Sequence, residues 1–328
     1  MDELLQAPVV PEVGVSYMPE DTSSFADALW ELIQNALETL NPDLVEASEI
    51  CIGIFAVVLL ISVIRLFPGA AERTADLAGA AGIAMLLLKS SDSLIRLGVS
   101  TITQISEYGK LLVPVLTSSL AAQGKISTST SLYAGTMLFD SLLTGILANF
   151  LVPGIYIYLA LSIAQAALGN ELIKKLAAFV KWLCVWILKA VLYIFTGYMG
   201  ITGVVSGTTD AAVLKAAKLT ISGAVPVVGG ILSDASEAVL VSAGVVKNAA
   251  GIYGILAILA VFAGPFVKIG CHYFLLKLTA AICAVLGTKR TTDLISDFSA
   301  SMGLILAATG SVCLLQLISA VCFLQGVG

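Results

Sequence analysis

Long apolar runs with very few charges constrain this chain more than any other feature. Of its 328 residues, 58% are hydrophobic and 12% are charged, and the mean hydropathy is +1.00. A soluble globular domain carries roughly 25% charged residues. Because a bilayer accepts only segments that satisfy their own backbone hydrogen bonds, these runs predict an all-α, polytopic integral membrane protein.

The apolar runs predict about six to eight crossings, at roughly 20 residues for each helix that spans a bilayer. The expected spans are residues 50–67, 77–97, 132–169, 176–199, 251–286 and 294–324. Two of these runs are about twice the length of one span. We expect them to break at Pro153-Gly154 and at Gly264-Pro265, because proline disrupts a helix interior.

The first 49 residues form an acidic leader. They hold 11 of the 22 acidic residues and no Lys or Arg, while Arg65 and Arg73 follow the first span. The positive-inside rule therefore predicts an extracytoplasmic N-terminus. Within the leader, residues 25–40 predict a short amphipathic helix that ends at Asn41-Pro42 and lies either on the membrane surface or on the protein itself. No basic stretch followed by an apolar run is visible at the start, so no signal peptide is predicted.

Residues 222–251 predict a re-entrant helical hairpin. The segment is apolar, yet it contains helix breakers and charges: Pro226, Gly229, Gly230, Asp234, Glu237 and Lys247. Such residues are tolerated at membrane depth only where the backbone is buried in protein or lines a wet cavity. The alternative is a plain transmembrane helix whose small residues serve packing.

The charges of this hairpin leave two interpretations open. Asp234 and Glu237 share a helix face just after the glycine pair, where they either coordinate a cation or cap the second half-helix. Lys247 either reaches the membrane interface or neutralises these carboxylates.

Two motifs recur at a fixed offset and predict an internally duplicated helical core. The Val-Pro-Val around Pro114 returns around Pro226, and the ILANFLVP run that ends at Pro153 returns as the ILAVFAGP run that ends at Pro265. A basic pair follows each copy. Duplicated units with discontinuous helices are typical of transporters and channels. The division predicted is residues 1–49 as leader, 50–105 as the first transmembrane helices, 106–212 as repeat A and 213–328 as repeat B, each repeat with a broken hairpin.

Motifs for catalysis and for metal binding are missing from the sequence. It contains no HExxH, GxSxG or Walker motif, so the chain is predicted not to be an enzyme and to need no cofactor. The single histidine, His272, and six scattered cysteines predict no metal site. No basic patch indicates binding to nucleic acid.

Part of the chain, about residues 105–325, resembles the stage III sporulation protein AE family of endospore-forming bacteria. The run GAVPVVGGILSDA within 222–251 carries the resemblance most specifically, followed by AAQGKISTS, by the aromatic helix KKLAAFVKWLCVWILKAVLYIFTG and by VVKNAAGIYG. The resemblance implies a protein of the mother-cell membrane around the forespore. Its implied partners are membrane lipid, the other proteins of the same sporulation operon and a forespore protein.

That family implies a subunit of a channel or secretion-like complex between the two cells, and a homo-oligomer is one expected form. Two other functions remain open on the residues alone. One is a stand-alone secondary transporter with its site between the two broken hairpins. The other is a scaffold without a pore, whose broken helices pack against partners.

Overall fold

The structure is a computed structural model, and it describes residues 8–21, 24–38, 40–65, 71–122, 126–201, 249–286 and 289–325. Every regular element in these ranges is helical. The elements are α1 (Glu12–Val15), α2 (Phe25–Glu38), α3 (Leu40–Ile64), α4 (Ala71–Ala122), α5 (Ile126–Ile146), a π-helical turn η2 (Leu147–Leu151), α6 (Val152–Leu168), α7 (Glu171–Ile201), α10 (Ala249–Leu286) and α11 (Lys289–Gln325).

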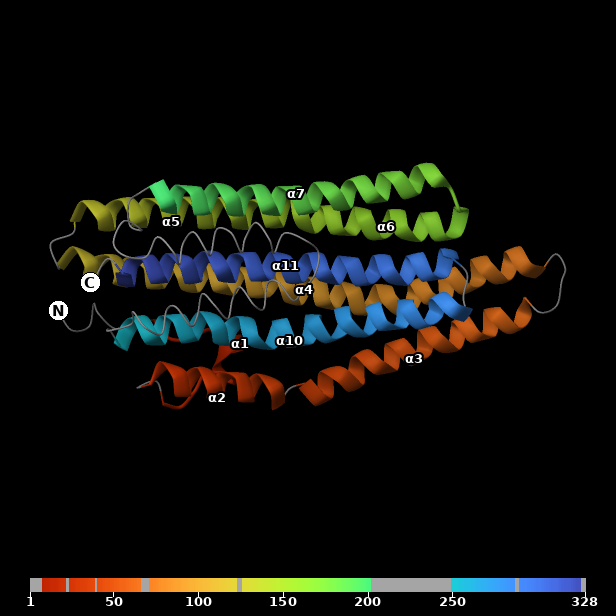
Figure 1. Cartoon of the computed structure of the whole chain (residues 1–328), viewed down its shortest axis with the longest axis horizontal. Helices are drawn as coiled ribbons and strands as arrows, with labels where there is room; N and C mark the ends of the chain where they lie inside the picture. Colours follow the sequence, from red (N-terminus) through yellow and green to blue (C-terminus); the bar gives the residue numbers. More distant parts are fainter. Residues whose placement is uncertain are drawn as a thin grey trace.

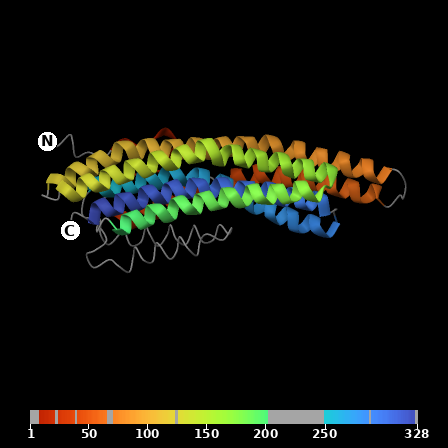
Figure 2. The same cartoon turned by 90° about the horizontal axis from the view of Figure 1, so that it is seen from above.

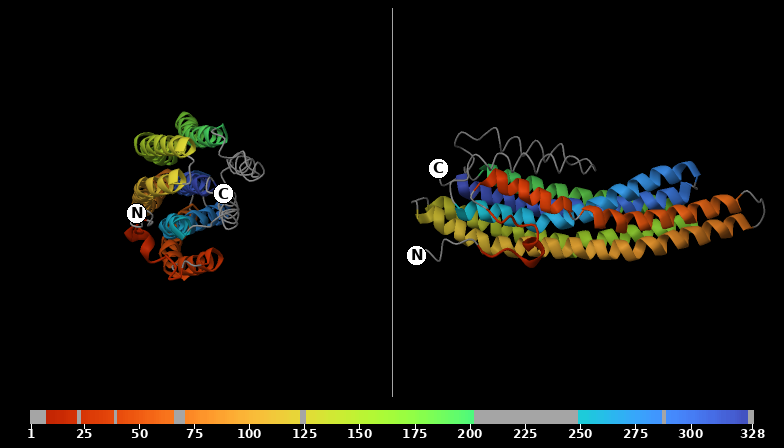
Figure 3. Two further views of the ribbon diagram at one scale, coloured as in Figure 1. Left: turned by 90° about the vertical axis from the view of Figure 1, so that its left-hand side faces the viewer. Right: turned by 90° about the horizontal axis from the view of Figure 1, so that it is seen from below.

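These helices run side by side in one elongated bundle (Figure 1). One outer layer holds α5, α6 and α7, the middle layer holds α4 and α11, and α10 leads to the opposite outer layer of α2 and α3 (Figure 1). The end-on view shows α11 between α4, α10 and the layer of α5, α6 and α7 (Figure 3, left). Its most apolar 18-residue window is 78% buried, against 22% for α7, so α11 is the axis of the bundle.

Six helical stretches among the described residues are long and apolar enough to cross a membrane. This confirms the expected all-helical, multi-pass architecture. The 52 residues of α4 extend about 78 Å at 1.5 Å per residue, well beyond the ~30 Å hydrocarbon core of a bilayer. The bundle, gently curved in Figure 2, is therefore longer than the membrane core is thick.

The helix break expected near Pro114 is wrong. Pro114 lies inside α4, which continues to Ala122, so the first member of the expected pair of broken hairpins is a continuous helix. Hydroxyl groups beside the proline add hydrogen bonds to the backbone: Thr117 donates to the Val113 carbonyl at 2.7 Å and Ser118 to the Val115 carbonyl at 2.8 Å. Neighbouring helices and such hydroxyls allow a proline inside a transmembrane helix.

The expected break at Gly264-Pro265 is also wrong, because α10 runs from Ala249 to Leu286 through Pro265. The leader covers this region. A Cβ on Gly14 of α1 would lie 2.8 Å from the Val261 side chain, and a Cβ on Gly264 would overlap the Tyr17 ring. Val261 precedes Pro265 by four residues, so close packing of the leader shields the carbonyl that proline leaves without its helical partner.

Near Pro153 the backbone hydrogen-bond pattern changes from α-helical to π-helical, but the helix does not end. The π-helical turn η2 joins α5 to α6, and the Val152 N–H bonds to the Leu147 carbonyl. The Asn149 side chain donates to the Gly145 carbonyl at 2.8 Å. The extra residue of a π turn therefore absorbs the proline that the sequence predicts to be a break.

The acidic leader packs on the protein itself. The helix α2 buries Phe25, Ala28, Leu32 and Ala36 against the bundle and ends at Glu38, and Pro42 lies in the first turn of α3 instead of terminating the amphipathic helix. Proline suits the first turn of a helix because the N–H groups there have no intrahelical acceptor.

Both basic pairs lie at the same end of the bundle. Lys174 of the first pair forms an ion pair with Asp293, which follows Lys289-Arg290 directly in α11. Gly169, the left-handed residue that ends α6, packs against Arg290. The helices that carry Pro153 and Pro265 also run in the same direction (Figure 1). The expected duplication of the core itself stays a prediction.

Candidate functional site

The hairpin singled out in the sequence lies outside the described residues. This applies to Pro226, Gly229, Gly230, Asp234, Glu237 and Lys247, whose expected roles stay predictions. The remaining sequence candidates, Pro114, Pro153 and Pro265, lie in α4, α6 and α10, where each is accommodated within a helix. The structure brings a different set of polar side chains together.

A buried carboxylate joins three helices at what we call the Asp140 junction: Ser106 of α4, Asp140 and Thr144 of α5, and Gln316 of α11. The Ser106 hydroxyl lies 2.6 Å from Asp140 Oδ2, and the Gln316 amide Nε2 donates to Asp140 Oδ1 at 2.7 Å. Thr144 donates to Ser106 Oγ at 3.2 Å. Asp140 is 2% exposed, so both carboxylate oxygens are out of contact with solvent and bind neutral groups.

The residues of this junction follow helical spacing. On α5, Thr136, Asp140 and Thr144 recur every fourth residue and share one face. On α11, Ser319 lies one turn beyond Gln316, and Thr136 donates to its hydroxyl at 3.4 Å. The polar contacts therefore extend along the seam between α5 and α11.

A glycine on α4 makes the Asp140 junction possible. Gly109 lies one turn after Ser106, and a Cβ at this position would overlap the Gln316 side chain. The close approach lets the Gln316 amide pass the α4 backbone and reach Asp140. Any side chain at position 109 would compete with that hydrogen bond.

A second polar cluster, the Asp297 junction, lies nearer the basic end and consists of Tyr158 of α6, Lys174 of α7, and Asp293 and Asp297 of α11. Tyr158 donates to Asp297 Oδ1 at 2.8 Å, and Lys174 Nζ lies 2.6 Å from Asp293 Oδ2. The Lys174 and Asp293 side chains are 40% and 30% exposed. Here an ammonium group and partial access to solvent compensate the acidic charge.

Two further ion-pair groups lie on the outside of the bundle. Lys268 of α10 contacts Glu46 at 2.6 Å and Asp43 at 3.6 Å, which ties α10 to the first turns of α3. Asp92 pairs with Arg96 at 2.8 Å and accepts a hydrogen bond from Tyr156 at 2.7 Å. Asp92 and Arg96, two charged residues within the expected span 77–97, thus pair with each other and with α6, and α4 continues through them.

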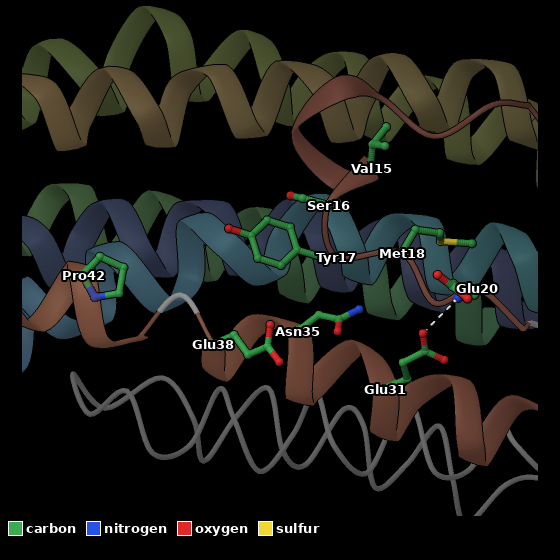
Figure 4. Close-up of a pocket in the computed structure, with 9 residues that line it drawn as sticks. All are labelled: Val15, Ser16, Tyr17, Met18, Glu20, Glu31, Asn35, Glu38 and Pro42. Carbon is green, nitrogen blue, oxygen red and sulfur yellow. Dashed lines mark hydrogen bonds between the residues drawn. The ribbon is translucent and has the colours of Figure 1, made fainter.

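A pocket of 560 Å³ lies within the leader, between residues 15–20 and the helix α2 (Figure 4). Its lining includes Glu20, Glu31 and Glu38, and the Glu20 N–H donates to Glu31 Oε1 at 3.1 Å. That hydrogen bond holds the segment before α2 against this helix. Within the described ranges, no three His, Cys, Asp or Glu residues come together as a possible metal site.

The sequence analysis missed the Asp140 junction because a single carboxylate in an apolar run matches no catalytic or metal-binding motif. The signal that could have found it is the spacing of Thr136, Asp140 and Thr144, which marks a polar stripe on an otherwise apolar helix. Gln316, the one amide in the last apolar run before residue 325, was a second signal. Their pairing depends on the tertiary arrangement of α5 and α11.

The sequence matches the model of one known protein family. A family model described as stage III sporulation protein AE matches residues 18–326. The chain belongs to the stage III sporulation protein AE family. The match covers both polar junctions, the leader helix α2 and all six apolar helical stretches.

A curated relative named stage III sporulation protein AE, from Bacillus subtilis (strain 168), is 28% identical over 236 residues. The match covers 72% of this chain and 59% of that relative, so the chain spans well under two thirds of the relative's length. No solved structure matches the chain. The family description is that of a sporulation protein and names no enzymatic activity.

Proposed function

We propose that this chain is a membrane subunit of the channel or secretion-like complex that joins the mother cell to the forespore. Membership of the sporulation family supports a role in sporulation, and six long apolar helical stretches support a location in the membrane. The partners proposed are the other proteins of the same operon, a forespore protein and further copies of the chain.

The observation that carries the proposal furthest is the contrast between the axis and the sides of the bundle. Phe298, Met302 and Ile305 of α11 are fully buried, so side chains fill the axis of the described bundle. On α7, Phe179, Trp182 and Trp186 stack along one face and are 54–57% exposed. A conduit would therefore lie between subunits, along these apolar sides, and not through the centre of one described bundle.

The charge distribution supports an orientation. The end that carries Arg65, Lys174 and Lys289 faces the mother-cell cytoplasm under the positive-inside rule. The acidic leader then lies on the opposite side, between the two cells. This agrees with the orientation expected from the acidic leader alone.

The duplicated core remains part of the proposal, as two parallel copies that both contain a proline-bearing helix followed by a basic pair. The second broken hairpin, at 222–251, also remains a proposal. A transporter site between two broken hairpins is not supported, because the first expected hairpin is part of the continuous helix α4. The filled axis favours a scaffold without a pore as the second candidate function.

Cysteine accessibility in the native host separates these functions. The gene is deleted and replaced by a cysteine-free version that restores heat-resistant spores. Single cysteines are then placed at the buried Ala308 and at the exposed Phe179, Leu60 and Leu142. During engulfment, the cells are treated with a small, water-soluble thiol reagent.

A conduit between subunits predicts labelling of at least one of the exposed positions and none of Ala308. A conduit along the axis predicts the reverse. A scaffold surrounded by lipid predicts no labelling at any of the four. The last two results would each overturn the proposed conduit, while loss of spores without the gene tests the sporulation role separately.

A further inference from the structure

The Asp140 junction differs from every other acidic cluster described above, because its carboxylate is fully buried, at 2% exposure, and both groups that contact it are neutral. Ser106 and Gln316 occupy the two oxygens at 2.6 and 2.7 Å. An ionised carboxylate buried this deeply is strongly disfavoured unless a positive charge or many donors compensate it.

The surrounding elements carry little charge. In sequence, Asp140 is the only charged residue of α5, and η2, α6 and the stretch of α11 from Ser299 to Phe323 have none. On α4 the nearest charged residues, Glu107 and Lys110, follow Ser106 directly and are exposed on the outside of the bundle. The described parts of these elements therefore give the Asp140 carboxylate no ion-pair partner, and the exposed Lys110 acts on it only through space.

We propose that the Asp140 junction is a proton-binding site and that Asp140 holds its proton while α4, α5 and α11 are packed together. A neutral carboxyl group has one O–H donor and one carbonyl acceptor. The short contact at Oδ2 then holds the proton between Asp140 and Ser106 Oγ, and Oδ1 accepts from Gln316. Release of the proton would leave an uncompensated negative charge buried between α4, α5 and α11. Protonation of Asp140 and packing of these helices are therefore coupled.

The geometry favours a proton over a metal cation. The 2.6 Å separation of the Asp140 and Ser106 oxygens is typical of an O–H···O hydrogen bond to a carboxyl group. Oxygens that share a sodium ion stand further apart, because the ion lies between them. The distances in the junction therefore fit a bound proton and do not fit a metal cation.

Infrared spectroscopy of the purified full-length chain in lipid vesicles tests the proposal. At pH 7, the wild-type spectrum minus that of Asp140→Asn should contain the carbonyl-stretch band of a protonated carboxyl group. The matched control, Asp293→Asn, removes a carboxylate that is ion-paired with Lys174 and should leave the band in place. Circular dichroism verifies that each variant keeps its helix content.

A second variant keeps the test decisive if Asp140→Asn does not fold. Ser106→Ala removes the oxygen that shares the proton, so the band should shift in frequency. Absence of any protonated-carboxyl band from wild type at pH 7 would overturn the proposal. So would a band that disappears in sodium chloride but not in choline chloride, because sodium would then be the ligand. Neither result bears on whether the chain serves a channel during sporulation.

Discussion

Two junctions attach outer helices to α11, and they compensate acidic side chains in different ways. At the Asp297 junction a lysine and a tyrosine contact the carboxylates, and the Lys174–Asp293 pair is partly exposed. At the Asp140 junction a serine and a glutamine contact a carboxylate that is 2% exposed. Both junctions fix helix positions, but only the first can do so with ionised groups at low cost.

The difference follows from position along the bundle. The Asp297 junction lies near the basic end, where long cationic side chains can reach carboxylates and keep contact with water. The Asp140 junction lies in a seam where α5 and α11 offer only hydroxyls and an amide. The same helix, α11, therefore uses charge near one end and neutral hydrogen bonds further along.

Asp140→Ala should have the largest effect. It leaves the Ser106 hydroxyl and the Gln316 amide buried without their hydrogen-bond partner, at about 1–3 kcal/mol for each group. We expect a loss of about 2–6 kcal/mol in the free energy of unfolding, measured by thermal unfolding of the purified protein followed by circular dichroism. A loss below about 1 kcal/mol would mean that the donors find other partners, and the junction would not hold the helices together.

Gly109→Ala should follow, with a loss of about 1–3 kcal/mol, because the added methyl group displaces Gln316 from Asp140. Gly145→Ala on α5 is the matched control, since a Cβ there meets nothing within 4 Å. The control should be neutral or should stabilise the helix by up to about 1 kcal/mol. Equal effects of the two alanines on the unfolding temperature would refute the close approach of α4 and α11.

Lys174→Gln should cost only about 0–1 kcal/mol, since the ion pair with Asp293 is partly exposed and screened by salt. The effect should shrink as the salt concentration rises, which unfolding curves at two ionic strengths would reveal. The charge-reversed double variant Lys174→Asp with Asp293→Lys should recover part of the loss. A loss that is large and insensitive to salt would contradict the contrast between the two junctions.

Asp140→Asn should have the smallest effect, about 1 kcal/mol or less, if the neutral acid is the native form. The amide of asparagine has the shape of the protonated carboxyl group and can serve the same two partners. The unfolding temperature in the same detergent provides the measurement. A loss as large as that of Asp140→Ala would show that the negative charge itself stabilises the junction.

The sequence predicted the helical, multi-pass architecture because hydrophobicity and charge depletion act locally along each segment. It also predicted the acidic leader as a separate region, and its helix α2 is present. What it did not predict is that α4 and α10 continue through Pro114 and Pro265. Hydroxyls near Pro114 and the leader packed over Val261 accommodate these prolines, and such contacts are tertiary.

The candidate site also depends on tertiary contacts that the sequence pattern does not predict. The stripe of Thr136, Asp140 and Thr144 is readable from spacing, but its partners Ser106 and Gln316 lie 34 and 176 residues from Asp140. The shared position of the two basic pairs was likewise not readable from the sequence. The Lys174–Asp293 ion pair places residues 119 positions apart at the same end of the bundle.

The shared end of the two basic pairs around α11 determines how the helices of the bundle are arranged. In a cysteine-free background, Lys174→Cys with Asp293→Cys should cross-link in the membrane with a short bifunctional thiol reagent. The control pair, Lys174→Cys with Ser319→Cys, should not, because Ser319 lies near the other end of α11. Efficient cross-linking of the first pair alone is the predicted result, and cross-linking of the control pair alone would contradict the arrangement of the bundle.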